Sequence, residues 1–144
     1  MSGRIFVLTS RRTFSAAIVS LAYLKQAGSN RVVIVGEPVG DRLMFFADGH
    51  PIRLPHSGLF LQRAEGRWDL RDGCRRYDDC VQFIPQPDRP AAPLPNGVRS
   101  VERLPIAVDT LDPDVYVQWR IESWLKGTDP MMDAVTALVA KERK

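Results

Sequence analysis

The stretch that decides the fold runs from Arg4 to Gly36 and reads RIFVLTSRRTFSAAIVSLAYLKQAGSNRVVIVG. Residues 4–9 and 31–36 are continuous β-prone apolar runs, which are typical of strands covered on both faces. Between them, residues 14–26 are apolar on most sides of a helix, and Gly28 is suited to end that helix. This order predicts a βαβ unit with parallel strands and a right-handed crossover.

The rest of the chain has a different character. Residues 44–47, 51–54 and 58–63 are short β-prone runs interrupted by glycine and proline. Residues 85–105 are rich in proline and poor in large apolar side chains, which indicates an extended arm or linker.

The C-terminal part is expected to hold a short strand within residues 113–117 and a short helix over 119–125. A last helix is then capped by Asp129, begins at Pro130 and runs to Lys144. We therefore expect an α/β fold with a core over residues 1–84, an arm over 85–112, and a C-terminal strand and helices over 113–144.

Composition excludes several classes of protein. The chain has 144 residues, of which 44% are hydrophobic and 26% charged, as in an ordinary globular domain. No apolar run is long enough to span a membrane, and the N-terminal residues lack a signal-peptide cleavage pattern. The 20 basic and 17 acidic residues are interleaved, whereas a nucleic-acid-binding module concentrates its basic residues on one element. We therefore expect no nucleic-acid partner.

Two cysteines, Cys74 and Cys80, lie close together in a loop-like stretch. They are equally consistent with a short disulfide and with two independent thiols, and the disulfide would favour an extracytoplasmic location. With His50 and His56 they do not have the spacing of a compact zinc site. The sequence also contains no glycine-rich nucleotide motif, so no cofactor or metal is predicted.

Ser15 is the best candidate for a reactive side chain. It falls in the first turn of the predicted helix, directly after a predicted strand. Helix N-terminal amides at this place stabilise developing negative charge, and the small Ala16 and Ala17 would let a substrate approach closely. The same spacing also suits a serine that caps the helix or packs in the core, which is the commoner role.

Residues 13–17 (Thr-Phe-Ser-Ala-Ala) and 33–40 (Val-Ile-Val-Gly-Glu-Pro-Val-Gly) resemble the core of the S41 serine peptidases, the tail-specific and C-terminal processing peptidases. Residues 113–117 and 127–134 are similar to the closing segment of that family, so the resemblance covers nearly the whole chain. It implies a partial crotonase-like (ClpP-like) core, a hydrolase activity on a peptide or protein substrate, and Ser15 as the nucleophile. The substrate-binding residues that it implies are Thr13, Ala16, Gly36, Glu37 and Gly40.

The general base departs from the family pattern. The family's catalytic lysine lies just past the Gly-Glu-Pro turn, where this sequence has Asp41 and Arg42 instead. A guanidinium stays protonated and cannot accept the proton of a serine. Asp41 and His56 are the candidate replacements, although a carboxylate is a weak base at neutral pH and a histidine beside a strand is more often a simple loop residue.

Two functions follow from these residues. The first is a serine-peptidase-like hydrolase, and the alternative is a catalytically inactive module for peptide binding or assembly. The alternative arises because the lysine and the family's upstream oxyanion loop do not occur in this sequence. The apolar run of residues 5–8 would then need a cover, and we expect a second copy of the chain or an upstream segment to provide it.

Overall fold

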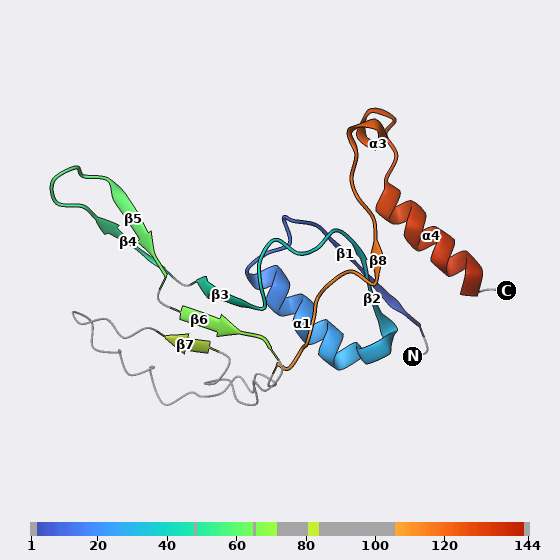
Figure 1. Cartoon of the computed structure of the whole chain (residues 1–144), viewed down its shortest axis with the longest axis horizontal. Coiled ribbons are helices and arrows are strands. Elements are labelled where there is room, and N and C mark those ends of the chain that lie inside the picture. Colours follow the sequence, from blue (N-terminus) through green and yellow to red (C-terminus); the bar gives the residue numbers. More distant parts are fainter. Residues whose placement is uncertain (1–2, 48, 65, 72–80, 84–105, 143–144) are drawn as a thin grey trace. The chain divides into compact units, whose positions relative to one another are not determined.

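The computed structural model describes residues 3–47, 49–64, 66–71, 81–83 and 106–142 of the chain (Figure 1). It is a mixed α/β structure, which confirms the predicted class. The chain forms two compact units. The first contains Met1–Arg42 and Thr110–Lys144, and the second contains Leu43–Asp109.

The first unit is built on the predicted βαβ unit. Its elements are β1 (Ile5–Thr9), α1 (Ala16–Gly28), the 3-10 turn η1 (Ser29–Arg31) and β2 (Val32–Gly36). β1 and β2 pair in parallel, in a register that runs from Ile5 opposite Val32 to Thr9 opposite Gly36. α1 begins two residues later than expected, because the residues before it form a hydrogen-bonded turn.

The expectation that β1 is buried on both faces is wrong. Ile5 and Leu8 are 43% and 41% exposed, whereas most of β2 is buried. The cause is the strand order β1-β2-β8, in which β2 lies in the centre and β1 pairs with β2 alone among the described strands. β1 has the sequence of a central strand but the position of an edge strand.

α1 is apolar on most sides, and within the described structure it buries one of them. Its buried residues Ile18, Leu21 and Ala22 are spaced at i, i+3 and i+4, while Leu24 is 41% exposed.

The end of α1 also differs from the prediction. Gly28 is its last helical residue, and the left-handed residue is Ser29, with φ 49°. Gly28 is required for close packing, because a Cβ at this position would strike Cγ2 of Val32.

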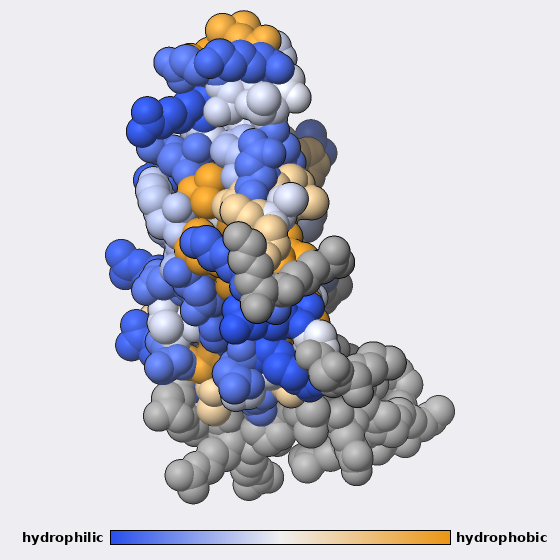
Figure 2. Space-filling model, turned by 90° about the vertical axis from the view of Figure 1, so that its right-hand side faces the viewer, coloured by the Kyte–Doolittle hydropathy of each residue, from blue (hydrophilic) through white to orange (hydrophobic). Residues whose placement is uncertain are grey.

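The C-terminal segment completes the first unit. β8 (Val115–Tyr116) pairs in parallel with β2, and α3 (Ile121–Leu125) and α4 (Pro130–Glu142) follow it. The predicted cap is confirmed, because Oδ1 of Asp129 accepts the N–H groups of Met131 and Met132 at 3.0 and 3.1 Å. α3 is strongly exposed: Figure 2 shows apolar atoms at the top of the view, where α3 lies in Figure 1.

The second unit contains two antiparallel sheets. One has the order β3-β6-β7 (Met44–Ala47, Gly66–Asp69 and Val81–Phe83), and the other is the hairpin of β4 and β5 (His50–Arg53 and Phe60–Arg63). The strands predicted near residues 44–47, 51–54 and 58–63 are confirmed. β6 escaped prediction because Trp68 is its single large apolar residue; the ring of Trp68 stacks on that of Phe45, with centroids 6.1 Å apart.

Several predictions concern residues that the structure does not describe. They include Cys74, Cys80 and most of the proline-rich arm expected over residues 85–112. Among the described residues, no helix is long and apolar enough to cross a membrane.

Candidate active site at the carboxyl ends of β1 and β2

Ser15 lies immediately before α1, in a backbone conformation that is rare for a residue other than glycine. Its φ and ψ are 55° and −126°, and its side chain is half-buried. Such a conformation costs about 1–3 kcal/mol and persists only where the surrounding structure enforces it. Residues 10–14 join this serine to the end of β1. Ser15 is the N-cap residue of α1, as the capping interpretation expects, but its side chain makes no capping hydrogen bond.

In the first turn of α1, one described amide group beside Ser15, that of Ala16, is left without an acceptor. The N–H of Ala17 donates to the carbonyl of Phe14 at 3.2 Å, and the N–H groups of Ile18 and Val19 both donate to the carbonyl of Ser15. Among the described residues, no acceptor is found for the N–H of Ala16. The amide that follows a nucleophilic serine is a standard donor to an oxyanion, so Ala16 is the candidate for that role.

The conformation of Ser15 is not sufficient evidence by itself, because Ser29 shares it. Ser29 has φ 49° and ψ −127°, and its N–H closes the carboxyl end of α1 by donating to the carbonyl of Lys25. The two serines therefore differ in place and not in backbone shape. Ser15 stands at the positive end of the helix dipole and Ser29 at the negative end, and the positive end alone favours an oxyanion.

The turn after β1 is held by a set of short hydrogen bonds. The N–H of Ser10 donates to Oγ1 of Thr13 at 3.0 Å, and the N–H of Thr13 donates back to the carbonyl of Ser10 at 2.8 Å. The N–H of Gly40 donates to the carbonyl of Thr13 at 2.9 Å. The loop after β2 is thus attached to the turn that leads into Ser15.

A second attachment joins the strand ends themselves. Oγ1 of Thr9 donates to the carbonyl of Glu37 at 2.8 Å, and the N–H of Glu37 donates to the carbonyl of Thr9 at 3.0 Å. Thr9 is 2% exposed and is the one buried polar residue among those that the structure describes. Its role was not predicted, although a hydroxyl at the end of an otherwise apolar strand was the available signal.

Two glycines allow the two loops to approach each other. Gly36 has φ 132°, and a Cβ there would strike the carbonyl oxygen of Thr9 and lie 3.1 Å from Cε of Met131. At Gly40 a Cβ would strike the carbonyl oxygen of Arg11. Both positions were expected to contact substrate, and the structure gives both a role in loop packing.

Most of the expected site residues share the two loops at this edge of the sheet. They are Thr13, Ser15, Ala16, Gly36, Glu37, Gly40 and Asp41. Asp41 is exposed, and its Oδ1 accepts the N–H of Arg42 at 2.8 Å. His56 belongs to the second unit, in the turn between β4 and β5.

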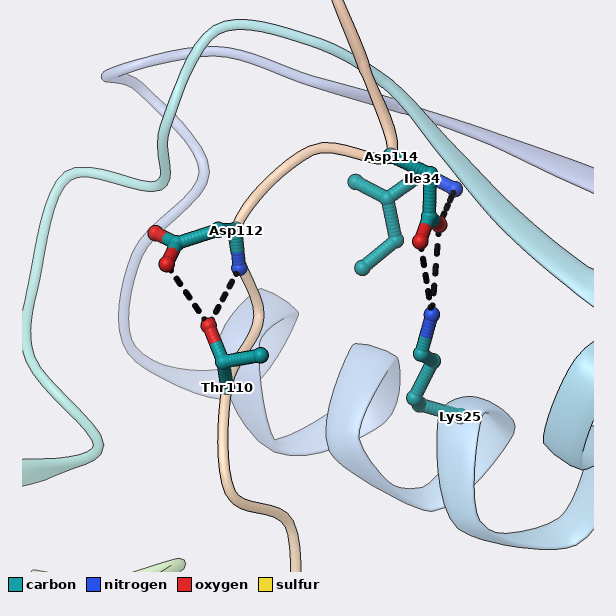
Figure 3. A network of polar contacts seen from close by, with 5 residues as sticks. All are labelled: Lys25, Ile34, Thr110, Asp112 and Asp114. Atoms are coloured by element: carbon teal, nitrogen blue, oxygen red, sulfur yellow. Dashed lines mark hydrogen bonds and ion pairs between the residues drawn. The ribbon is translucent and has the colours of Figure 1, made fainter.

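The lysine nearest to Ser15 in the sequence has a structural partner. Nζ of Lys25, in the last turn of α1, lies 3.2 Å from Oδ2 of Asp114, and the same oxygen accepts the N–H of Ile34 at 2.8 Å (Figure 3). Beside it, the hydroxyl of Thr110 bonds both the carboxylate and the amide of Asp112. This network attaches the C-terminal segment to β2 and uses Lys25 at the end of α1 remote from Ser15.

Comparison with known proteins found no matching family model, no similar curated protein and no similar solved structure. Among the described residues, no group of three metal-binding side chains occurs. The function is therefore inferred from the residues at the carboxyl ends of β1 and β2.

Proposed function

We propose that this chain is the nucleophile-bearing part of a serine hydrolase of the S41 peptidase type, with a partial crotonase-like core and Ser15 as the nucleophile. The observation that carries the proposal is the left-handed backbone of Ser15, without a capping bond, between a parallel strand and the start of a helix. Peptide bonds are the proposed substrate, since the resemblance to S41 peptidases in residues 13–17 and 33–40 points to them.

In the proposed reaction, Oγ of Ser15 attacks the carbonyl carbon of the substrate and its proton passes to a base. The oxyanion that forms accepts the N–H of Ala16 and is stabilised by the positive end of α1. Collapse of this intermediate releases the amine with the returned proton and leaves an acyl group on Ser15, which water then removes.

Of the two candidate bases, Asp41 belongs to the loop after β2, which a described bond from Gly40 joins to the turn before Ser15. It follows Gly40, whose N–H is bonded to Thr13, two residues before Ser15. We therefore expect Asp41→Asn to reduce the reactivity of Ser15 and His56→Ala to leave it unchanged. The opposite result would assign the base to His56 in the β4–β5 hairpin.

The test of the nucleophile is covalent labelling with a fluorophosphonate, read by intact mass. Ser29→Ala is the matched control, because it removes a hydroxyl from the same backbone conformation. We expect a single adduct on the wild type and on Ser29→Ala, and none on Ser15→Ala. A folded wild type that takes no adduct, or an equal adduct on Ser15→Ala, would reject the hydrolase proposal.

The position of β1 favours a second candidate function, the binding of extended peptide. Among the described strands β1 pairs with β2 alone, so no described strand covers the backbone groups of its other edge. A peptide that adds as a strand needs these groups and no general base. The test is fluorescence polarisation of a labelled extended peptide with Ser15→Ala. Saturable binding by this variant, with no phosphonate adduct on the wild type, would favour this candidate, and absence of binding would reject it.

A further inference from the structure

Thr13 bonds to both loops of the site through three of its polar groups. Its Oγ1 accepts the N–H of Ser10 at 3.0 Å, its N–H donates to the carbonyl of Ser10 at 2.8 Å, and its carbonyl accepts the N–H of Gly40 at 2.9 Å. The first two bonds close the turn after β1, and the third joins that turn to the loop after β2. Thr13 therefore joins the turn after β1 to the loop after β2, in addition to the bonds between Thr9 and Glu37.

We infer that Thr13 is a positioning residue for Ser15, an assignment that rests on the proposed role of Ser15 as nucleophile. The φ of 55° at Ser15 is unfavourable, so the chain must be held on both sides of it. On the helix side, the carbonyl of Ser15 is fixed by the N–H groups of Ile18 and Val19. On the side toward β1, Thr13 is the nearest residue to Ser15 with a described hydrogen bond to another loop, the bond from the N–H of Gly40.

The hydroxyl is the part of Thr13 that a substitution can remove. Its oxygen is the acceptor that closes the turn from Ser10, while the backbone groups of Thr13 persist in any variant. Without that acceptor, the turn loses one of its two closing bonds, and the carbonyl that holds Gly40 is no longer fixed in direction. Thr13 was predicted to contact substrate. The hydrogen bonds instead give it an indirect role, which is to position Ser15.

The test compares three variants by their rate of fluorophosphonate labelling. Thr13→Val keeps the shape of the side chain and removes the acceptor, whereas Thr13→Ser keeps the acceptor. Thr136→Val is the matched control, because the Thr136 hydroxyl donates to the carbonyl of Met132 on the surface of α4. We expect Thr13→Val to label roughly 10- to 100-fold more slowly than wild type, as misplaced reacting groups do. Thr13→Ser should recover most of the rate, and Thr136→Val should match the wild type.

Rates are measured at a temperature where circular dichroism shows each variant to be folded. A merely structural role for Thr13 would lower the melting temperature of Thr13→Val and leave its labelling rate at the wild-type value. That result would overturn the inference. A slow rate in Thr13→Ser equal to that of Thr13→Val would overturn it as well, since the acceptor is then not the cause.

Hydrogen exchange gives a second readout that needs no reactivity. In Thr13→Val, the amides of Ser10, Gly40 and Ile18 should all exchange at least about 10-fold faster. We expect this because the loss of one hydrogen bond loosens both the turn before Ser15 and its attachment to the loop after β2. Faster exchange at Ser10 alone would mean a local bond without a positioning role, and would overturn the inference. If the wild type takes no label, the hydrolase proposal fails. The exchange pattern still decides whether Thr13 fixes the turn before Ser15.

Discussion

Two regions differ in what fixes their backbone conformation. One is the pair of loops at the carboxyl ends of β1 and β2, and the other is the β4–β5 hairpin. At the loops, Thr9 is buried and hydrogen bonds reach from one loop to the other. In the hairpin, every residue of both strands is exposed, and the described bonds run within the hairpin. Each region contains a candidate catalytic residue, Ser15 or His56. A catalytic residue predicted from the sequence is better supported where hydrogen bonds hold the backbone around it in one conformation.

The hairpin also has an apolar face without a described cover. Ile52 stands opposite Leu61 in the register, and Leu54 bonds to Leu59 one step further along, so these four side chains lie on one face. They are 39–66% exposed. An isolated two-stranded hairpin is marginally stable in water. The hairpin therefore contributes little to the stability of the chain, whereas the loops at β1 and β2 are joined to each other and to the buried Thr9 by hydrogen bonds.

Glycine substitutions test this contrast with the largest expected effect. Gly36→Ala places a Cβ against the carbonyl oxygen of Thr9 at a φ of 132°, whereas Gly58→Ala in the hairpin turn meets no atom closer than 3.5 Å at a φ of 69°. We expect Gly36→Ala to lower the free energy of unfolding by about 3 kcal/mol or more, and Gly58→Ala by about 1 kcal/mol. Urea denaturation followed by circular dichroism measures both. Equal losses would show that the two regions are held equally firmly.

The elements that were predictable from the sequence are those whose signals are local. The strand, helix and strand of residues 4–36 follow from apolar periodicity, and the start of α4 follows from the cap at Asp129. The edge position of β1 was not predictable, because it depends on the order in which distant strands pair. The bond from Asp114 to the N–H of Ile34 crosses 80 residues of sequence and has no local signal.

The candidate site was predictable to a similar degree. Ser15 was predicted from its residue type and place after a strand, and the site residues of the loop after β2 were predicted from the family resemblance alone. The partners that hold those loops, the carbonyl groups of Thr9 and Thr13 above all, are backbone atoms that every residue has. No sequence pattern marks them.

The hydrogen bonds of Asp114 give the next largest expected effect on the free energy of unfolding. Asp114→Ala leaves the N–H of the buried Ile34 without its described acceptor, which should cost about 2 kcal/mol of the free energy of unfolding. Lys25→Met removes the cation and keeps that bond, so it should cost less than about 1 kcal/mol, as partly exposed ion pairs do. Urea denaturation of the two variants measures the difference. A larger loss from Lys25→Met would mean that the ion pair, and not the strand amide, holds the C-terminal segment to β2.

The cap of α4 is a smaller test of how firmly the first unit is held. Asp129→Ala removes the acceptor for two helix amides and should cost about 1 kcal/mol. Asp133→Ala is the matched control, because Asp133 lies in the first turn without a capping bond and contributes mainly through the helix dipole, about 0.3 kcal/mol. Thermal unfolding of both variants checks the order. The reverse order would contradict the capping role of Asp129.

The smallest effect is expected in the hairpin itself. Phe60 is 72% exposed, so Phe60→Ser should change the free energy of unfolding by less than about 0.5 kcal/mol. Urea denaturation at two protein concentrations, with sedimentation at the same concentrations, makes the measurement decisive. A loss above about 1.5 kcal/mol that grows with concentration would mean that a second copy of the chain covers the hairpin. The exposed region would then be an interface, and its backbone would be held by the partner as firmly as the loops around Ser15 are held by β1 and β2.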